Sequence, residues 1–310
     1  MPAWAHGNES YDDYPTSKFL VCAYGIHLSY GVPSLIRYFT IIYNILHSPY
    51  SQVPFYRLFL IDGYINIGSF IYSMIERFIE IGLFPGFIVW MPLKYYLSVI
   101  YFFENYAMYL PMCSLSVISF NRFSSAFFGI NYDKFWRDHL NKFIVCVLFA
   151  PCLFTWHILF SQAYFTPLDG GGFAMAYTRN ITWMRNSENM MIVSTFAMTS
   201  CTLFTTATLF RLRFIASISV RQAERRLLLI TAIMSISLIG QFLIAVAFYF
   251  DGTLWNIPEK LYVLLFLLRP FAIDLAILSP SWTMHFLNRS IANGKSEFRS
   301  SLHSNVIQVG

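Results

Sequence analysis

Charged side chains are scarce in this sequence. Of its 310 residues, 12% are charged, whereas 56% are hydrophobic and 19% are aromatic. An ordinary soluble domain has about 25% charged residues, so a soluble chain of this length could not cover its surface with so few. The composition therefore excludes an ordinary soluble protein and indicates one that is embedded in a membrane.

The sequence also lacks the residues of a catalytic or metal site. It has no glycine-rich phosphate loop, no HExxH motif and no serine–histidine–acid set, and its histidines are scattered over separate segments. Asp62 and Asp274 are the only pair of acids that an intramembrane hydrolase could use. We therefore expect no enzyme, no metal and no cofactor. The net charge of +5 fits anionic lipid headgroups, and we do not expect nucleic-acid binding.

Cysteines are few, and we expect no cleavable targeting sequence. None of the five cysteines lies in the long connection 164–188, so that segment cannot be tied to a helix by a disulfide. We expect the cysteines to be packing residues of helices. Residues 1–18 are polar and partly acidic, whereas a signal peptide opens with positive charge. The first apolar run is therefore expected to insert as its own anchor.

Long apolar runs are what the sequence has in abundance. A helix needs about 20 mostly apolar residues to cross the hydrocarbon core, and lipid offers no partners to unpaired backbone groups. The predicted fold is an all-α membrane protein, a bundle of seven transmembrane helices. The predicted spans are about 22–46, 54–75, 95–121, 142–163, 189–210, 227–250 and 259–282. Residues 1–21 would precede this 22–282 domain, and residues 283–310 would form a cytoplasmic tail.

The loops carry an asymmetric distribution of positive charge. If the N-terminus is outside, the inner loops hold about twice as many Lys and Arg residues as the outer ones, which is the normal bias of membrane proteins. The glycosylation sequons at Asn8 and Asn180 then fall outside, and the one at Asn288 falls inside, where it should stay unmodified. The sequence thus predicts an extracellular N-terminus and a plasma-membrane glycoprotein.

Ionisable groups inside predicted spans are costly and suggest function. Arg37, Asp62 and Asp274 share a depth in spans one, two and seven, and Asn66 lies one helical turn from Asp62. We expect Arg37 to pair with Asp62 or Asp274, with Asn66 joining the network. Two interpretations stay open, a purely structural buried pair and a conformational latch or ion site.

A second set of polar residues lies toward the outer ends of the spans. Glu104 in span three and Arg269 in span seven are at depths that long side chains could bridge. Such a pair would line an outer cavity for a small amphipathic ligand. The alternative places Glu104 at headgroup level. Other residues assigned to this pocket are Asn105, Tyr109 and Tyr262, with Tyr101, Phe102 and Tyr106 as walls.

Asn121 and Arg122 stand where the third span ends, at the predicted cytoplasmic face. An arginine held there by an inactive-state partner could swing to meet a G protein when the helices part. Arg221, Arg225 and Arg226, before span six, would add positive charge to the same surface, although ordinary positive-inside placement explains these three better. Seven spans, an extracellular N-terminus, an arginine at the inner end of span three and a basic third inner loop together resemble a G-protein-coupled receptor.

Three segments resemble the nematode chemoreceptors of serpentine receptor class gamma, the Srg family. They are NRFSSAFFGINYDKFW after span three, with Tyr132 and Trp136 four apart, DLAILSPSWTMHFLNRSI in span seven, and FYRLFLIDGYINIGS in span two. Gly129 stands where the family usually has proline, and Ser281-Trp282 stands where proline-tyrosine is usual. Related classes such as Srv and Sru therefore stay open.

The resemblance implies a chemosensory receptor in the cilium of a sensory neuron. It implies an odorant or pheromone-like small-molecule ligand and coupling to a heterotrimeric G protein, with Tyr132 and Trp136 near the coupling surface; a receptor dimer is left open. The rival from another class is a seven-helix ligand-gated channel or transporter subunit, whose N-terminus would lie inside.

Overall fold

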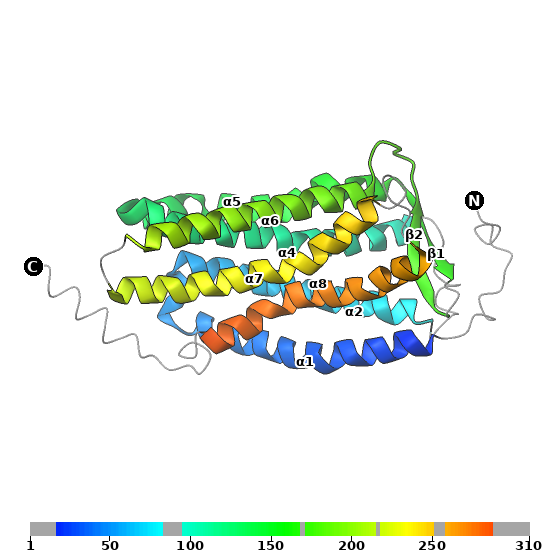
Figure 1. Cartoon of the computed structure of the whole chain (residues 1–310), viewed down its shortest axis with the longest axis horizontal. Coiled ribbons are helices and arrows are strands. Elements are labelled where there is room, and N and C mark those ends of the chain that lie inside the picture. Colours follow the sequence, from blue (N-terminus) through cyan, green and yellow to red (C-terminus); the bar gives the residue numbers. More distant parts are fainter. Residues whose placement is uncertain (1–16, 83–94, 168–170, 215–217, 251–257, 288–310) are drawn as a thin grey trace, which may run out of the picture.

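The chain forms a bundle of long helices that is capped at one end by a β-hairpin (Figure 1). The computed structural model describes residues 17–82, 95–167, 171–214, 218–250 and 258–287, apart from some side chains near the ends of these ranges and in the last helix. These ranges contain seven long helices: α1 (Lys18–Leu46), α2 (Pro54–Glu80), α4 (Tyr95–Phe128), α5 (Tyr132–Leu159), α6 (Asn186–Leu212), α7 (Ile218–Phe250) and α8 (Glu259–Leu287).

The predicted seven-helix membrane fold is confirmed. The shortest of the seven helices have 27 residues, about 40 Å at 1.5 Å per residue, which exceeds the thickness of the hydrocarbon core. Among the described residues, five stretches are long and apolar enough to cross a membrane, and one of them, Tyr96–Leu159, contains both α4 and α5. Figure 1 shows α1 beginning at the hairpin end and α8 ending at the opposite end.

Local sequence explains where several helices begin and end. The Ser17 hydroxyl accepts a hydrogen bond from the Leu20 amide, 3.3 Å, and so caps the start of α1. Pro54 occupies the first turn of α2, where a missing amide costs nothing. Past the end of α2, Gly82 has φ of 74°, a left-handed value that glycine adopts without strain.

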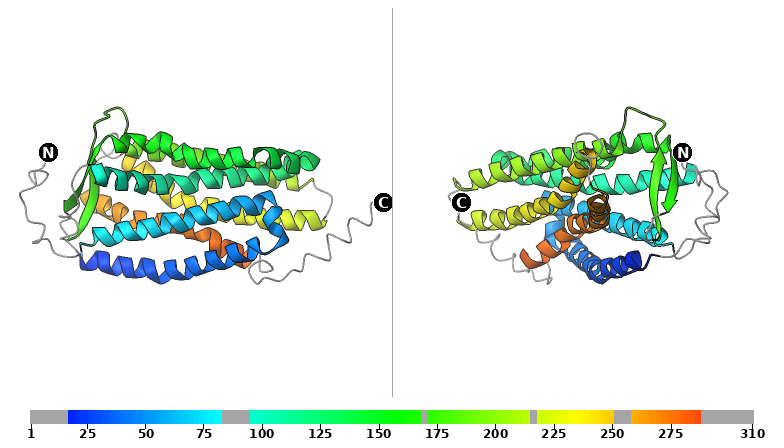
Figure 2. Two further views of the ribbon diagram at one scale, coloured as in Figure 1. Left: turned by 180° about the vertical axis from the view of Figure 1, so that it is seen from behind. Right: turned by 45° about the vertical axis from the view of Figure 1, so that its right-hand side comes forward.

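Helix α4 is the centre of the bundle. It packs against α2, α5, α6, α7 and α8, while α1 packs against α2 and α8. The two views of Figure 2 show α1 at one side of the bundle and α5 and α6 at the other. The large hydrophobic core runs through all of these helices, and its largest fully buried side chain is Trp136.

The outward faces of the helices are apolar. Phe149, Leu153, Phe196 and Leu203 all have more than 60% of their surface exposed. Side chains of this kind are stable in that position when lipid, and not water, surrounds them. The inverse arrangement holds inside, where polar groups such as Asp62 are buried between helices. This inside-out distribution agrees with the membrane assignment.

The connection between α5 and α6 contains a hairpin that the sequence did not suggest. Strands β1 (Gln162–Pro167) and β2 (Phe173–Thr178) pair antiparallel, and they lie across the end of the bundle (Figure 2). No disulfide holds it, since all five cysteines are free. Instead the Ser98 hydroxyl of α4 accepts from the Ala163 amide, 3.1 Å, and donates to the Ser161 carbonyl, 2.6 Å.

Candidate functional site

A buried ion pair joins α2 to α8. Arg77 donates from its two terminal nitrogens to the two carboxylate oxygens of Asp274, at 2.8 Å each. Asp274 is 1% exposed and also contacts His27, 2.6 Å, and Tyr30. A bidentate arginine of this geometry gives a strong, charge-assisted contact. The sequence had not assigned Arg77 a role, because α2 continues five residues beyond the predicted span end at residue 75.

The predicted pairing of Arg37 is wrong. Its guanidinium lies beside His285 on α8, with Nη1 2.6 Å from Nε2, and stacks over the Trp282 ring at 4.7 Å. Both of the expected acids have other partners: Asp274 contacts Arg77, and Asp62 accepts a hydrogen bond from Asn66. The depth argument failed because depth fixes a residue's height along the bundle but says nothing of which way its side chain faces.

Asn66 contacts Asp62 as predicted, but the network that they form includes Tyr38 in place of Arg37. The Asn66 amide donates to Asp62, 2.8 Å, and to the Tyr38 hydroxyl, 3.1 Å. Tyr38 in turn donates to the Ile277 carbonyl of α8, 2.7 Å. Each of these three polar side chains is at most 1% exposed. The network therefore links α1, α2 and α8.

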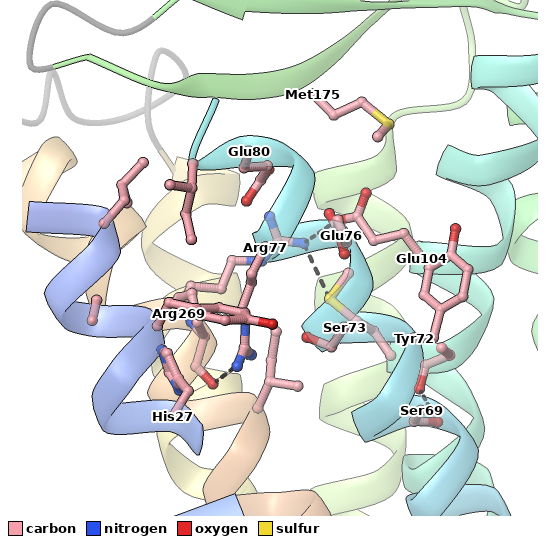
Figure 3. A pocket seen from close by; sticks show the side chains of 18 of the residues that line it. His27, Ser69, Tyr72, Ser73, Glu76, Arg77, Glu80, Glu104, Met175 and Arg269 are labelled. Atoms are coloured by element: carbon pink, nitrogen blue, oxygen red, sulfur yellow. Dashed lines mark hydrogen bonds and ion pairs between the residues drawn. The ribbon is translucent and has the colours of Figure 1, made fainter. Parts of the chain in front are cut away.

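Glu104 and Arg269 meet as expected. The Arg269 Nη2 atom is 3.8 Å from a carboxylate oxygen of Glu104, and it also lies 3.1 Å from the Met108 sulfur. Figure 3 shows this pair on the wall of a cavity, with Glu76, Arg77 and Glu80 projecting from α2. The cavity has a volume of about 110 Å³ and lies between α1, α2, α4 and α8, under Met175 of the hairpin.

The glutamates of α2 were missed by the sequence reasoning. Glu76 and Glu80 lie in the stretch that was taken as a connection after span two. Their spacing of four residues puts both on one face of a helix once α2 is known to continue. That spacing, with Arg77 next to Glu76, is the signal that could have located them.

A wider cavity adjoins the first and opens toward the hairpin. It has a volume of about 420 Å³ and reaches Gln241 of α7 and Asn186 at the start of α6. Both cavities share Tyr101, Met108, Met175, Arg269 and Ile273. We refer to the two together as the outer cavity. Its combined size is that of a small-molecule site.

Other pocket residues predicted from the sequence have mixed outcomes. Tyr101 lines the outer cavity, whereas the Tyr106 hydroxyl donates to the Leu148 carbonyl of α5, 2.8 Å, and Phe102 packs beside the hairpin cluster. Asn105 and Tyr109 both bind Asn186, at 2.6 and 2.9 Å, and so act as supports of the wall. The side chain of Tyr262 lies outside the described residues.

The hairpin contributes a polar wall at the outer cavity. The Tyr177 hydroxyl accepts from the Asn186 amide, 3.2 Å, and burial raises the pKa of this phenol above its ordinary value. Tyr177 therefore stays neutral at physiological pH. Its ring lies 5.3 Å from that of Tyr101, which couples the hairpin to α4.

The opposite end of the bundle holds the Asn121–Arg122 pair. Arg122 is 3% exposed; its Nη2 donates to the Asn121 carboxamide, 2.6 Å, and its guanidinium stacks over the Phe55 ring at 4.1 Å. Asn121 donates to the Tyr132 hydroxyl, 3.0 Å. Trp136 is fully buried and its indole N–H donates to Ser124, 2.8 Å. The four residues singled out in the segment after span three thus lie close together at this end of the bundle.

Some predicted site residues lie outside the described residues, and one predicted glycosylation site lies within them. Arg221, Arg225 and Arg226 belong to α7, but their side chains lie outside the described residues, as does Asn8 altogether. Asn180 is exposed next to the hairpin, and its amide nitrogen lies 2.5 Å from the Phe160 carbonyl. Its sequon is therefore at the same end of the bundle as the outer cavity.

These features define a multi-pass membrane protein with a ligand-sized cavity at one end and a buried asparagine–arginine pair at the other. The sequence profile of the Srg family chemoreceptors matches residues 24–293. The chain therefore belongs to the Srg family, a family of serpentine, seven-transmembrane chemoreceptors.

Individual relatives agree with this assignment. Serpentine receptor class gamma-4 of Caenorhabditis elegans is 26% identical over 285 residues, which cover 86% of this chain and 84% of the relative. Class gamma-10 is 26% identical over 76% of the chain and 74% of its own length, and class gamma-5 is 24% identical over 86% and 81%. The similarity thus extends over nearly the whole helical bundle.

Proposed function

We propose that this chemoreceptor binds a small organic molecule in the outer cavity and transmits its occupancy to a heterotrimeric G protein at the opposite end. The observation that carries the proposal is the Glu104–Arg269 pair at 3.8 Å, on the wall of a cavity under the hairpin. Charged groups inside a membrane bundle are rare and usually mark a binding site or a conduction path. The cavity walls combine these charges with aromatic and apolar side chains, which suits a small amphipathic ligand.

The orientation in this proposal places the hairpin end outside the cell. The Asn180 sequon is exposed at that end, and inner connections carry the positive-charge excess that orients membrane proteins. The receptor would lie in the plasma membrane of a sensory cilium, with Asn8 and Asn180 as glycosylation sites. Transmission requires that the ligand bind one packing of the helices more tightly than the other.

The position of Arg122 supports coupling at the inner end. It is buried against Phe55 and Asn121, and separation of α2 from α4 would expose it to a partner. Asn121, Tyr132 and Trp136 would position this arginine, and Arg221, Arg225 and Arg226 of α7 would add charge to the same surface.

Ligand binding is tested by a cell assay with promiscuous G proteins and a screen of small-molecule extracts. An extract that activates the wild type should lose activity on Glu104→Gln or Arg269→Gln, whereas Glu188→Gln should respond normally, because Glu188 lies at the start of α6 but lines neither cavity. A response that is equal in all three variants would contradict the proposed pocket.

The competing function is that of a channel or transporter subunit. The two functions differ in the side of the membrane on which the N-terminus lies. An epitope tag fused to residue 1 should be accessible to antibody on intact cells if the N-terminus is extracellular. A tag that reacts only after permeabilisation would contradict the receptor orientation and favour the channel.

A further inference from the structure

The walls of the smaller cavity carry more acidic side chains than arginines, three glutamates against Arg77 and Arg269. Glu76, Glu80 and Glu104 all line it, and the first two are close enough to Glu104 to interact with it electrostatically. In the described part of the chain, no cation lies within ion-pair distance of Glu76 or Glu80. The three carboxylates thus face one weakly paired cation, Arg269.

Arg77, the second arginine on the wall of the smaller cavity, already forms an ion pair with Asp274. Arg77 makes two contacts of 2.8 Å with Asp274, and His27 contacts the same carboxylate at 2.6 Å. Arg77 is therefore paired with Asp274, which leaves Arg269 as the arginine nearest to Glu104 at the cavity wall. Three carboxyl groups held together away from water cannot all ionise without a large free-energy cost, and a bound counter-charge lowers that cost.

Unused hydrogen-bonding atoms of the cavity point to the same kind of ligand. The Oε2 atom of Glu104 and the side-chain oxygen of Gln241 are buried without a partner, and Gln241 is only 5% exposed. Both atoms can accept a hydrogen bond from a donor that a ligand brings into the cavity. A ligand that offers N–H groups would satisfy them.

The aromatic walls also favour a cation. Tyr72 and Tyr101 line the smaller cavity beside the glutamates, and tyrosine faces attract ammonium groups. A metal ion fits less well, because the described residues contain no group of three His, Cys, Asp or Glu side chains with the spacing to hold one. The wider cavity, with Ile244, Ala245 and Phe248 on its wall, gives room for an apolar body.

From this geometry we infer that the outer cavity binds an organic ammonium ion, with the amine in the recess between Glu76, Glu80 and Glu104 and the apolar body toward α7. The inference rests on the proposed role of the cavity as the ligand site and names the chemical class of the ligand. The exposed Arg179 and Arg185 at the rim of the wider cavity lie beyond the recess, where solvent screens them.

The test uses three probes of one length: hexylamine, hexanol and hexanoate. The purified receptor in nanodiscs is melted at neutral pH with each probe, because a ligand that binds the native state raises the melting temperature. Hexylamine, which is protonated there like a lysine side chain, should raise it in a saturable way, and the other two should not. A shift with hexanoate but not hexylamine, or with no probe at all, overturns the inference.

Charge-neutral variants locate the amine. Glu76→Gln and Glu80→Gln should each weaken the apparent affinity for hexylamine by about tenfold or more, as expected for loss of a charge-assisted contact. Glu188→Gln should keep the wild-type affinity and controls for unspecific partitioning. Unchanged affinity in both glutamine variants would overturn the assigned position.

The melting assay needs no G protein, so the two proposals can fail separately. Saturable hexylamine binding that is lost in the variants, without any G-protein response in cells, would contradict the proposed coupling and leave the amine site standing. Conversely, a receptor that signals to an anionic or neutral compound through Glu104, but does not bind hexylamine, would keep the proposed function and refute the ligand class.

Discussion

Arg77 of α2 and Asp274 of α8 hold each other through two contacts of 2.8 Å, and Asp274 is 1% exposed. The two residues are 197 positions apart in the sequence. Because Arg77 also lines the outer cavity, the pair connects the cavity wall on α2 directly to α8.

Removal of Arg77 should strongly destabilise the receptor. Arg77→Ala leaves the Asp274 carboxylate buried without its cation, and loss of one partner of a buried pair costs about 3–5 kcal/mol. We expect a lower melting temperature in detergent and reduced surface expression. Arg57→Ala is the matched control, because Arg57 is exposed and, within the part of the chain that the structure describes, donates to Ser51 and Gln52. A comparable loss in both variants would show that the pair contributes no special stability.

The Ser124–Trp136 hydrogen bond should fasten α5 to the inner end of α4. Ser124→Ala removes the acceptor of the fully buried indole N–H, and an unsatisfied buried donor costs about 1–3 kcal/mol. The measurement is the free energy of unfolding in mild detergent. Ser29→Ala controls for the loss of a helix serine, since Ser29 is exposed and donates to the Ile26 carbonyl of its own helix. This variant should change the free energy of unfolding by less than about 0.5 kcal/mol.

Gly172 should be required for the hairpin to pack closely against the ends of α1 and α2. Its φ is 81°, and a Cβ atom there would lie 2.7 Å from both the Glu80 carbonyl oxygen and a Leu20 methyl group. Gly172→Ala should therefore lift the hairpin and speed hydrogen exchange across residues 162–178. Gly25→Ala is the control, because a Cβ at Gly25 meets nothing within 4 Å and alanine favours a helix. Equal exchange in the two variants would argue against the close contact.

Arg122→Ala should abolish activation of the G protein and leave surface expression intact. Arg122 lies at the end of the bundle opposite the outer cavity, stacked on Phe55, and its release is the step that we propose for coupling. The measurement is ligand-stimulated nucleotide exchange on the G protein in membranes with equal receptor levels. Arg57→Ala is the control, because it also removes an arginine, two residues after Phe55 in the sequence, and it should retain signalling. Normal signalling by Arg122→Ala would falsify the proposed role of Arg122.

Phe55→Leu should raise signalling in the absence of ligand. Leucine keeps an apolar side chain but removes the ring face that holds the Arg122 guanidinium at 4.1 Å, an interaction of about 1–2 kcal/mol when desolvated. The population of the released arginine would then increase about fivefold or more. Basal activity equal to that of the wild type at matched expression would contradict a restraining role for Phe55.

The helical architecture could be predicted from the sequence because bilayer thickness demands long apolar runs, and these are visible without tertiary information. The same reasoning found Glu104 and Arg269, since charges in such runs stand out. It placed Arg37 with the wrong partner and overlooked Arg77, because neither helix rotation nor the true end of α2 can be read from hydropathy.

The sequence by itself determined that the chain is a membrane bundle of seven helices and, through the Asn121–Trp136 segment, indicated its family. Those properties follow from local composition and short-range spacing. Only the tertiary structure decided that Arg77 binds Asp274, that Arg37 lies on Trp282, and that a hairpin covers three converging glutamates. Partners 200 or more positions apart, such as Arg37 and His285, 248 apart, are set by how helices rotate and pack, and no local pattern encodes that rotation.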